Sequence, residues 1–142
     1  MKILLAFLLM LAAPLCHAAP TTLSVVTLSE TAASLAASSA DTTNGNQIRN
    51  RTCDLFLVLE NIDESDSATV TVAASGSSFT VPGVGATTKS NASVSLSATQ
   101  KKHIGPFRCK GWNDSSGYVQ LTYSGVASSA VRVSPLRLPT TF

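Results

Sequence analysis

CDLFLVLENIDESDSATVTVA, residues 53–73, carries the two patterns that decide the fold. Its first half contains an unbroken apolar run from Leu55 to Leu59, which is typical of a strand in the middle of a sheet. Residues 61–66 are polar or acidic except for Ile62, and they indicate a turn. After this turn Val70 and Val72 alternate with threonines, which is the pattern of a strand with one buried face. The stretch therefore predicts two neighbouring strands of an all-β protein.

The same alternation of apolar and polar residues recurs along the rest of the chain. It is found in residues 23–28, 92–98, 118–123 and 130–133, between turns rich in glycine, asparagine and proline. Seven or eight short strands without a convincing helix predict a single antiparallel β-sandwich of jelly-roll or immunoglobulin-like type, spanning residues 19–142.

Two segments do not show this regular alternation. Residues 31–40 are rich in alanine and serine, and they fit a weak strand or a short helical turn equally well. Ile104–Phe107 is predicted to be an edge or bulged strand, because Pro106 has no N–H group to donate to a neighbouring strand.

Residues 1–18 have the pattern of a secretory signal peptide. Lys2 supplies the positive charge, Ile3–Leu15 form the apolar core, and cleavage is expected after Ala18 or Ala19. The core is too short to span a membrane as a helix, which takes about 20 residues. A lipid anchor on Cys16 is disfavoured by the leucine before it. The pattern predicts an exported protein, periplasmic or extracellular, without a stable membrane anchor.

Export changes the interpretation of the cysteines. Once the signal peptide is removed, Cys53 and Cys109 are the two that remain, an even number in an oxidising compartment. A metal site or a nucleophile pair is the alternative, but neither cysteine lies in a C-x-x-C motif or near a histidine cluster. The pattern favours a structural disulfide between Cys53 and Cys109.

Composition argues against several classes of function. Only 13% of the 142 residues are charged and the net charge is +2, which excludes an acidic disordered tail and a nucleic-acid binder driven by bulk positive charge. Aromatic residues make up 6%, so stacking platforms for bases or sugars are poorly supplied.

The chain also has few of the residues that catalysis and metal binding need. His103 is the one histidine outside the signal peptide, and it follows two lysines in a polar stretch typical of a surface. No nucleophile-elbow, zinc-protease or phosphate-loop motif is present. The clustered acids fit neither a calcium loop of the EF-hand type nor facing carboxylates across a cleft: Glu60, Asp63, Glu64 and Asp66. We therefore expect no enzymatic activity, no cofactor and no metal.

Charge is unevenly distributed along the sequence. Residues 19–66 contain seven acids against Arg49 and Arg51, a balance of −5, whereas residues 67–142 contain seven bases against Asp114, a balance of +6. Interleaving of the two halves in a Greek-key fold would blur this difference. Otherwise it predicts faces of opposite sign, suited to head-to-tail packing or to docking on a lattice of subunits.

Three segments carry a further pattern. They are NGNQIRN (44–50), LFLVLEN (55–61) leading into ATVTV (68–72), and IGPF (104–107) followed by GYVQLTYSGV (117–126). In this order they resemble small tailed-phage virion proteins of the head-decoration or capsid-surface type. The resemblance covers most of residues 41–133. It implies a β-sandwich without a catalytic site, whose function is surface complementarity to a protein shell.

Two functions are consistent with these patterns. The first is a non-enzymatic structural or surface protein that docks on a repeating protein assembly, at the virion surface if the resemblance extends to location. The second is an exported bacterial binding or adhesion module that recognises a glycan or protein at the cell surface. Its candidate contact residues are Trp112, Asn113, Asp114 and Tyr118, unless they simply form a turn in which Trp112 covers the core. Neither function involves nucleic acid, and a homo-oligomer remains open.

Overall fold

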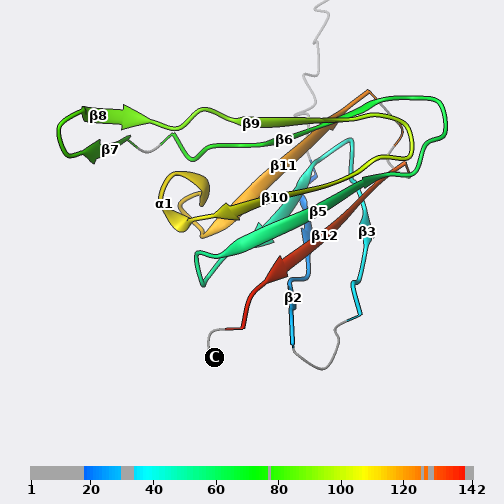
Figure 1. Ribbon diagram of the computed structural model, residues 1–142, viewed down its shortest axis with the longest axis horizontal. Coiled ribbons are helices and arrows are strands. Elements are labelled where there is room, and N and C mark those ends of the chain that lie inside the picture. The colour runs from blue at the N-terminus through cyan, green and yellow to red at the C-terminus, as the bar shows by residue number, and fades with distance from the viewer. Residues whose placement is uncertain (1–17, 30–33, 77, 126, 128–129, 140–142) are drawn as a thin grey trace, which may run out of the picture.

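A computed structural model describes residues 18–29, 34–76, 78–125, 127 and 130–139, and it shows an all-β domain (Figure 1). The predicted signal peptide lies outside these residues except for Ala18, and so do residues 31–33 of the alanine- and serine-rich segment. The rest of that segment contains a short strand, β3 (Ser38–Ser39), and no helix. Within the described ranges, no helix is long and apolar enough to cross a membrane.

Two five-stranded sheets face each other as a sandwich. The first sheet contains, in spatial order, β1 (Thr21–Leu23), β4 (Asn46–Arg49), β11 (Tyr118–Ser124), β6 (Ala68–Val72) and β9 (Ala92–Leu96). The second contains β10 (Lys101–Phe107), β5 (Leu55–Asn61), β12 (Val131–Arg137) and β2 (Val26–Thr27), with β3 also paired to β12. A hairpin of β7 (Ser78–Val81) and β8 (Gly85–Thr88) projects beyond β6 and β9, and α1 (Cys109–Trp112) is a single irregular turn (Figure 1).

The all-β class and the sandwich are confirmed, but the number and direction of the strands differ from the prediction. The described residues form twelve strands rather than seven or eight, and two pairs, β1 with β4 and β2 with β12, are parallel. The strand expected over residues 23–28 is divided, because Leu23 pairs with Ile48 in the first sheet and Val26 with Leu136 in the second. The chain keeps its direction as it crosses between the sheets, so both short strands run parallel to their partners.

The hairpin also adds strands that the pattern did not show. Residues 85–88 are polar and glycine-containing, which predicts a loop, yet they form β8. The turn at Pro82-Gly83 brings them beside β7, and main-chain hydrogen bonds form without any apolar alternation. A number of strands predicted from apolar alternation is therefore too low where strands pair without burying their side chains.

The longer strands pair in a nested order. In the first sheet β4 pairs with β11 and β6 pairs with β9, while in the second sheet β5 pairs with β10, and all three pairs are antiparallel. The successive strands β4, β5 and β6 thus pair with β11, β10 and β9, respectively. Each connection within these two halves crosses from one sheet to the other, so the paired strands wind around the core as a ribbon.

β5 is the central strand that the sequence predicts. It lies between β10 and β12, and the side chains of Leu55, Leu57 and Leu59 are at most 1% exposed in the core. Val70 and Val72 of β6 face them from the other sheet and are fully buried. Burial of these apolar side chains, each contributing about 1.5–3 kcal/mol, is the main favourable term for the fold.

β10 is an edge strand with an irregularity, as its proline predicts. It pairs with β5 alone, and the register shifts between Ile104 and Phe107, across a cis Gly105–Pro106 peptide. Gly105 has a φ of +127°, and a Cβ atom there would lie 2.9 Å from the carbonyl oxygen of Leu55. Only glycine fits this position, because any other side chain would collide with the backbone of β5.

Candidate interaction surface

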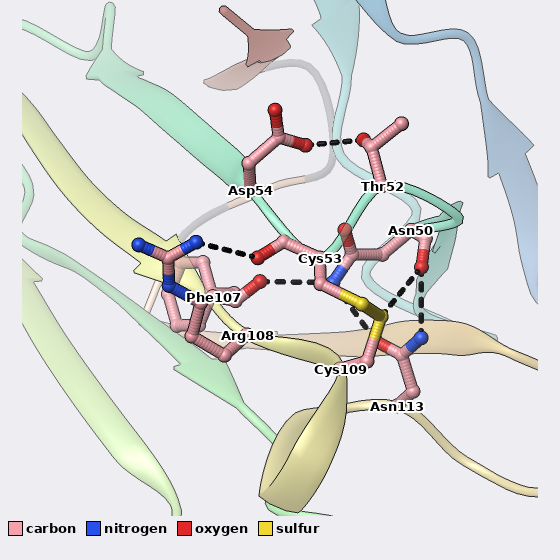
Figure 2. The surroundings of a disulfide bond; sticks show 8 residues. All are labelled: Asn50, Thr52, Cys53, Asp54, Phe107, Arg108, Cys109 and Asn113. Carbon is pink, nitrogen blue, oxygen red and sulfur yellow. Dashed lines mark hydrogen bonds between the residues drawn. A yellow bond between two sulfur atoms is a disulfide. The ribbon is translucent and has the colours of Figure 1, made fainter. Parts of the chain in front are cut away.

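A disulfide between Cys53 and Cys109 joins the loop before β5 to the segment after β10 (Figure 2). The two Cα atoms lie 4.6 Å apart, although the residues are separated by 56 positions in the sequence. This confirms the disulfide predicted from the number of cysteines. Structural disulfides persist in oxidising compartments, so the bond fits a protein that leaves the reducing cytoplasm.

Asn50 is a buried polar residue beside the disulfide and is only 2% exposed. Its side-chain amide donates hydrogen bonds of 2.9 Å to the carbonyl oxygen of Phe107 and to Oδ1 of Asn113. Asn113 donates in return to the carbonyl oxygen of Asn50, over 2.8 Å (Figure 2). Asn113, one of the predicted contact residues, is therefore bonded within the fold.

Trp112 lies half-buried against the hydrophobic core. Its ring meets that of Phe107 edge to face, with the ring centres 5.0 Å apart and the planes at 85°. The ammonium group of Lys89 lies 4.9 Å from the centre of the Trp112 ring, a cation–π contact. Trp112 thus covers one end of the core. This is the position expected for it if the predicted contact residues simply form a turn.

Asp114 organises the turn before β11. Its Oδ1 accepts hydrogen bonds of 2.9 Å from the backbone N–H groups of Ser116 and Tyr118, and its Oδ2 accepts one of 2.6 Å from Gln120. Burial opposes ionisation of this carboxyl, but the hydrogen bonds outweigh burial and lower its pKa. The guanidinium of Arg49 lies 4.9 Å from the centre of the Tyr118 ring.

The four predicted contact residues therefore lie together at one corner of the sandwich, all half-buried. Each makes a contact within the fold, through a hydrogen bond or a ring. Their contact with a partner stays a prediction.

The acidic turn between β5 and β6 is held by hydrogen bonds from its own backbone N–H groups to the side chain of Asp63. Oδ1 of Asp63 accepts hydrogen bonds from the N–H groups of Ser65 and Asp66, both 2.9 Å long, and these bonds lower the pKa of Asp63. Glu64 and Asp66 are exposed. Within the described residues no group of three His, Cys, Asp or Glu side chains is placed to bind a metal ion.

Charged side chains gather by sign at the two ends of the sandwich. The basic end is where β4 and β12 finish, and its charged residues in the described part of the chain are Arg49, Arg51, Lys89, Arg108, Lys110 and Arg137, with Asp54 and Asp114. The acidic end is where β5 finishes, and it contains Asp41, Glu60, Asp63, Glu64 and Asp66, with Lys101, Lys102 and Arg132. Six bases and two acids give the basic end a net charge of +4, and five acids and three bases give the acidic end −2. This difference is smaller than that between the two halves of the sequence, −5 and +6, because each end contains residues from both halves.

Two hollows on the surface of the described residues differ in their chemistry. One, of about 180 Å³, is apolar and lies on the outer side of the second sheet, where Phe56, Val58 and Leu136 line it beside the exposed His103. The other, of about 400 Å³, lies at the basic end and is lined by residues 22–25 with Arg49, Arg51 and Arg137.

The arginine-lined hollow was not predicted from the sequence. In the sequence Arg49 and Arg51 contribute to the charge balance, and their spacing of two places them on one side of an extended segment. Arg137 comes from the far end of the chain and reaches them only through the pairing of β12 with β5 and β2. That long-range pairing leaves no local signal.

Comparison with models of protein families, with curated proteins and with solved structures finds no match to this chain.

Proposed function

We propose that the protein is a non-enzymatic surface protein that docks on a repeating protein assembly, the function implied by its resemblance to virion decoration proteins. The observation that carries this proposal is the separation of charge between the acidic end and the basic end. A domain with ends of opposite sign meets a charged lattice in one orientation, because reversal would bring like charges together. Orientation of this kind suits a protein that occupies many identical sites.

The nested pairing supports a jelly roll rather than an immunoglobulin-like fold. In a jelly roll a ribbon of paired strands winds across two packed sheets, and the order β4-β11, β5-β10, β6-β9 corresponds to that winding. The disulfide adds a covalent link between two of the crossing loops. A rigid domain loses little conformational entropy when it docks, which favours binding by surface complementarity.

The proposed location of the mature protein is outside the cytoplasm, either periplasmic or extracellular. The disulfide and the signal-peptide pattern of residues 1–18 both support export. A capsid-like lattice or a cell-surface component would then be the assembly that the protein meets.

The alternative, an exported module that recognises a glycan or protein through Trp112, Asn113, Asp114 and Tyr118, has weaker support. The amide of Asn113 and the carboxylate of Asp114 already make hydrogen bonds within the fold, so less of their bonding capacity is left for a ligand. The charged side chains of the two ends are exposed or half-buried, and none of them is fully buried, so their charges remain accessible to a partner.

Density-gradient fractionation of culture medium from the native producer, with mass spectrometry of the fractions, tests the docking function. We expect co-sedimentation with the subunits of a large assembly, such as capsid proteins, at about 0.1 M salt and release at about 1 M, where charges are screened within about 3 Å. Another small exported protein, which should stay at the top of the gradient, is the control for nonspecific trapping of small proteins in large assemblies. Recovery only as slowly sedimenting free protein would contradict docking and favour the exported module.

A further inference from the structure

The hollow at the basic end brings three arginines together from three parts of the fold. Arg49 ends β4 of the first sheet, Arg137 ends β12 of the second, and Arg51 belongs to the loop that joins β4 to β5. Residues 22–25, where the chain crosses from β1 to β2, form the remaining wall. The described residues that line this hollow include no acid.

These arginines leave most of their N–H groups unused. The guanidinium carbon of Arg49 lies 4.9 Å from the centre of the Tyr118 ring, and the Arg49 side chain donates no hydrogen bond to the residues that the structure describes. Arg137 donates through Nε to Oγ1 of Thr27 over 2.6 Å, which leaves its two terminal nitrogens. Arg51 is exposed and has no hydrogen bond or ion pair with the residues that the structure describes.

None of the three arginines forms a salt bridge in the described part of the chain, where the ion pair is Lys101–Glu60 at the acidic end. Like charges around one hollow repel each other, and an anion between them would remove that repulsion. Guanidinium groups present paired N–H donors that match the two oxygens of a carboxylate or phosphate. The hollow therefore has the chemistry of an oxoanion site.

We propose that this hollow binds carboxylate side chains presented by the docking partner. The inference rests on the proposed docking function for the identity of the partner, and it adds the chemistry of the contact. Leu23 and Val25 supply an apolar part of the wall. The methylene groups of a glutamate can pack on that part, whereas a free phosphate ion would leave it uncovered.

Calorimetric titration of the disulfide-bonded protein with a hexaglutamate peptide at low ionic strength tests the site. The double variant R51Q/R137Q removes two of the three guanidinium groups, and we expect its affinity to fall about tenfold or more. The control is K101Q/R132Q, which removes the same charge at the acidic end, outside the hollow, and should bind within about twofold of the wild type. Unchanged thermal melting shows that each variant is folded. Equal weakening of both double variants would overturn the inference, because binding would then follow net charge alone.

A second titration with inorganic phosphate at the same ionic strength separates a carboxylate side chain from a free anion. We expect phosphate to bind at least about tenfold more weakly than the peptide, because phosphate does not use the apolar wall. Phosphate that binds as tightly as hexaglutamate, with the same loss in R51Q/R137Q, would overturn the assignment to carboxylates.

The two variants in the native producer distinguish failure of the site from failure of docking. Loss of co-sedimentation in R51Q/R137Q but not in K101Q/R132Q would support the site. Normal co-sedimentation of R51Q/R137Q would overturn the site and leave the docking function standing. Arginine-dependent peptide binding by a protein that never co-sediments would overturn docking, and with it the assignment of the site to a docking partner.

Discussion

Asn50 and Asn113, 63 positions apart in the sequence, join two loops of the sandwich through reciprocal hydrogen bonds of 2.9 and 2.8 Å. The side chain of each donates to the other residue, and Asn50 donates a further bond to the carbonyl oxygen of Phe107. This arrangement needs a side chain that offers two N–H groups from a buried position, which asparagine supplies at low volume. It lies beside the disulfide, so the same loops are connected both covalently and by buried polar groups.

Replacement of Asn50 should therefore destabilise the protein well beyond the loss of one surface contact. Asn50→Ala removes two hydrogen bonds and leaves the Phe107 carbonyl and Oδ1 of Asn113 without their donor. We expect the free energy of unfolding to fall by about 2–3 kcal/mol, measured by urea denaturation. Asn91→Ala is the control, because the exposed Asn91 makes one hydrogen bond, and its loss should cost about 1 kcal/mol or less. Equal costs for both variants would contradict the role of Asn50.

The disulfide should contribute strongly to stability. It closes a loop of 56 positions, and the chain-entropy model gives about 4 kcal/mol for a loop of that length. We expect thiol labelling of the denatured, non-reduced mature protein to find no free thiol. Reduction, or the pair Cys53→Ser and Cys109→Ser, should lower the midpoint of urea denaturation. Two labelled thiols without reduction would show that the bond is absent from the protein.

The core position of Leu57 leads to the sharpest prediction about the fold. Leu57→Asp would bury an unpaired carboxylate in a fully enclosed site between two sheets, so we expect no folded protein by circular dichroism. Leu57→Ala should fold and lose about 2–5 kcal/mol through the cavity that it leaves. Thr71→Asp tests the same charge on the outer side of β6, where the side chain is half-exposed, and should fold. A Leu57→Asp variant that melts like the wild type would refute the placement of β5.

The predictable parts of this fold are the strands whose burial leaves a pattern of apolar residues in the sequence. β5, β6, β9 and β11 bury one or both faces, and their apolar residues mark them in the sequence. The edge irregularity of β10 is likewise marked, by Pro106. By contrast β1, β2 and β3 are two or three residues long and carry almost no periodicity, so their pairing and parallel direction depend on contacts that no local pattern records.

The candidate surface is less predictable for a related reason. The disulfide follows from the parity of two cysteines, and the turn at Asp114 follows from its residue types. The separation of charge into two ends depends on which strand termini lie side by side, and the arginine hollow depends on Arg137 meeting Arg49 and Arg51 across more than 80 positions of sequence. Both are products of sheet topology.

The turn before β11 should make stability depend on pH in the acid range. The pKa of Asp114 is lowered in the folded protein from its usual 3.8, because the hydrogen bonds from Tyr118, Gln120 and Ser116 outweigh the opposing effect of burial. A carboxyl with a lower pKa in the folded state stabilises the fold at pH values above its unfolded pKa, and this contribution is lost as the pH falls through the folded pKa.

Asp114→Asn keeps an oxygen that can accept the two backbone hydrogen bonds but removes the titration. We expect the melting temperature of this variant to fall less steeply than that of the wild type as the pH decreases from about 5 to 2. Some acid dependence should remain, because backbone hydrogen bonds also lower the pKa values of Asp41 and Asp63. The measurement is thermal melting at several pH values across this range. A melting temperature that falls as steeply in the variant as in the wild type would show that the Asp114 carboxylate does not stabilise the turn before β11.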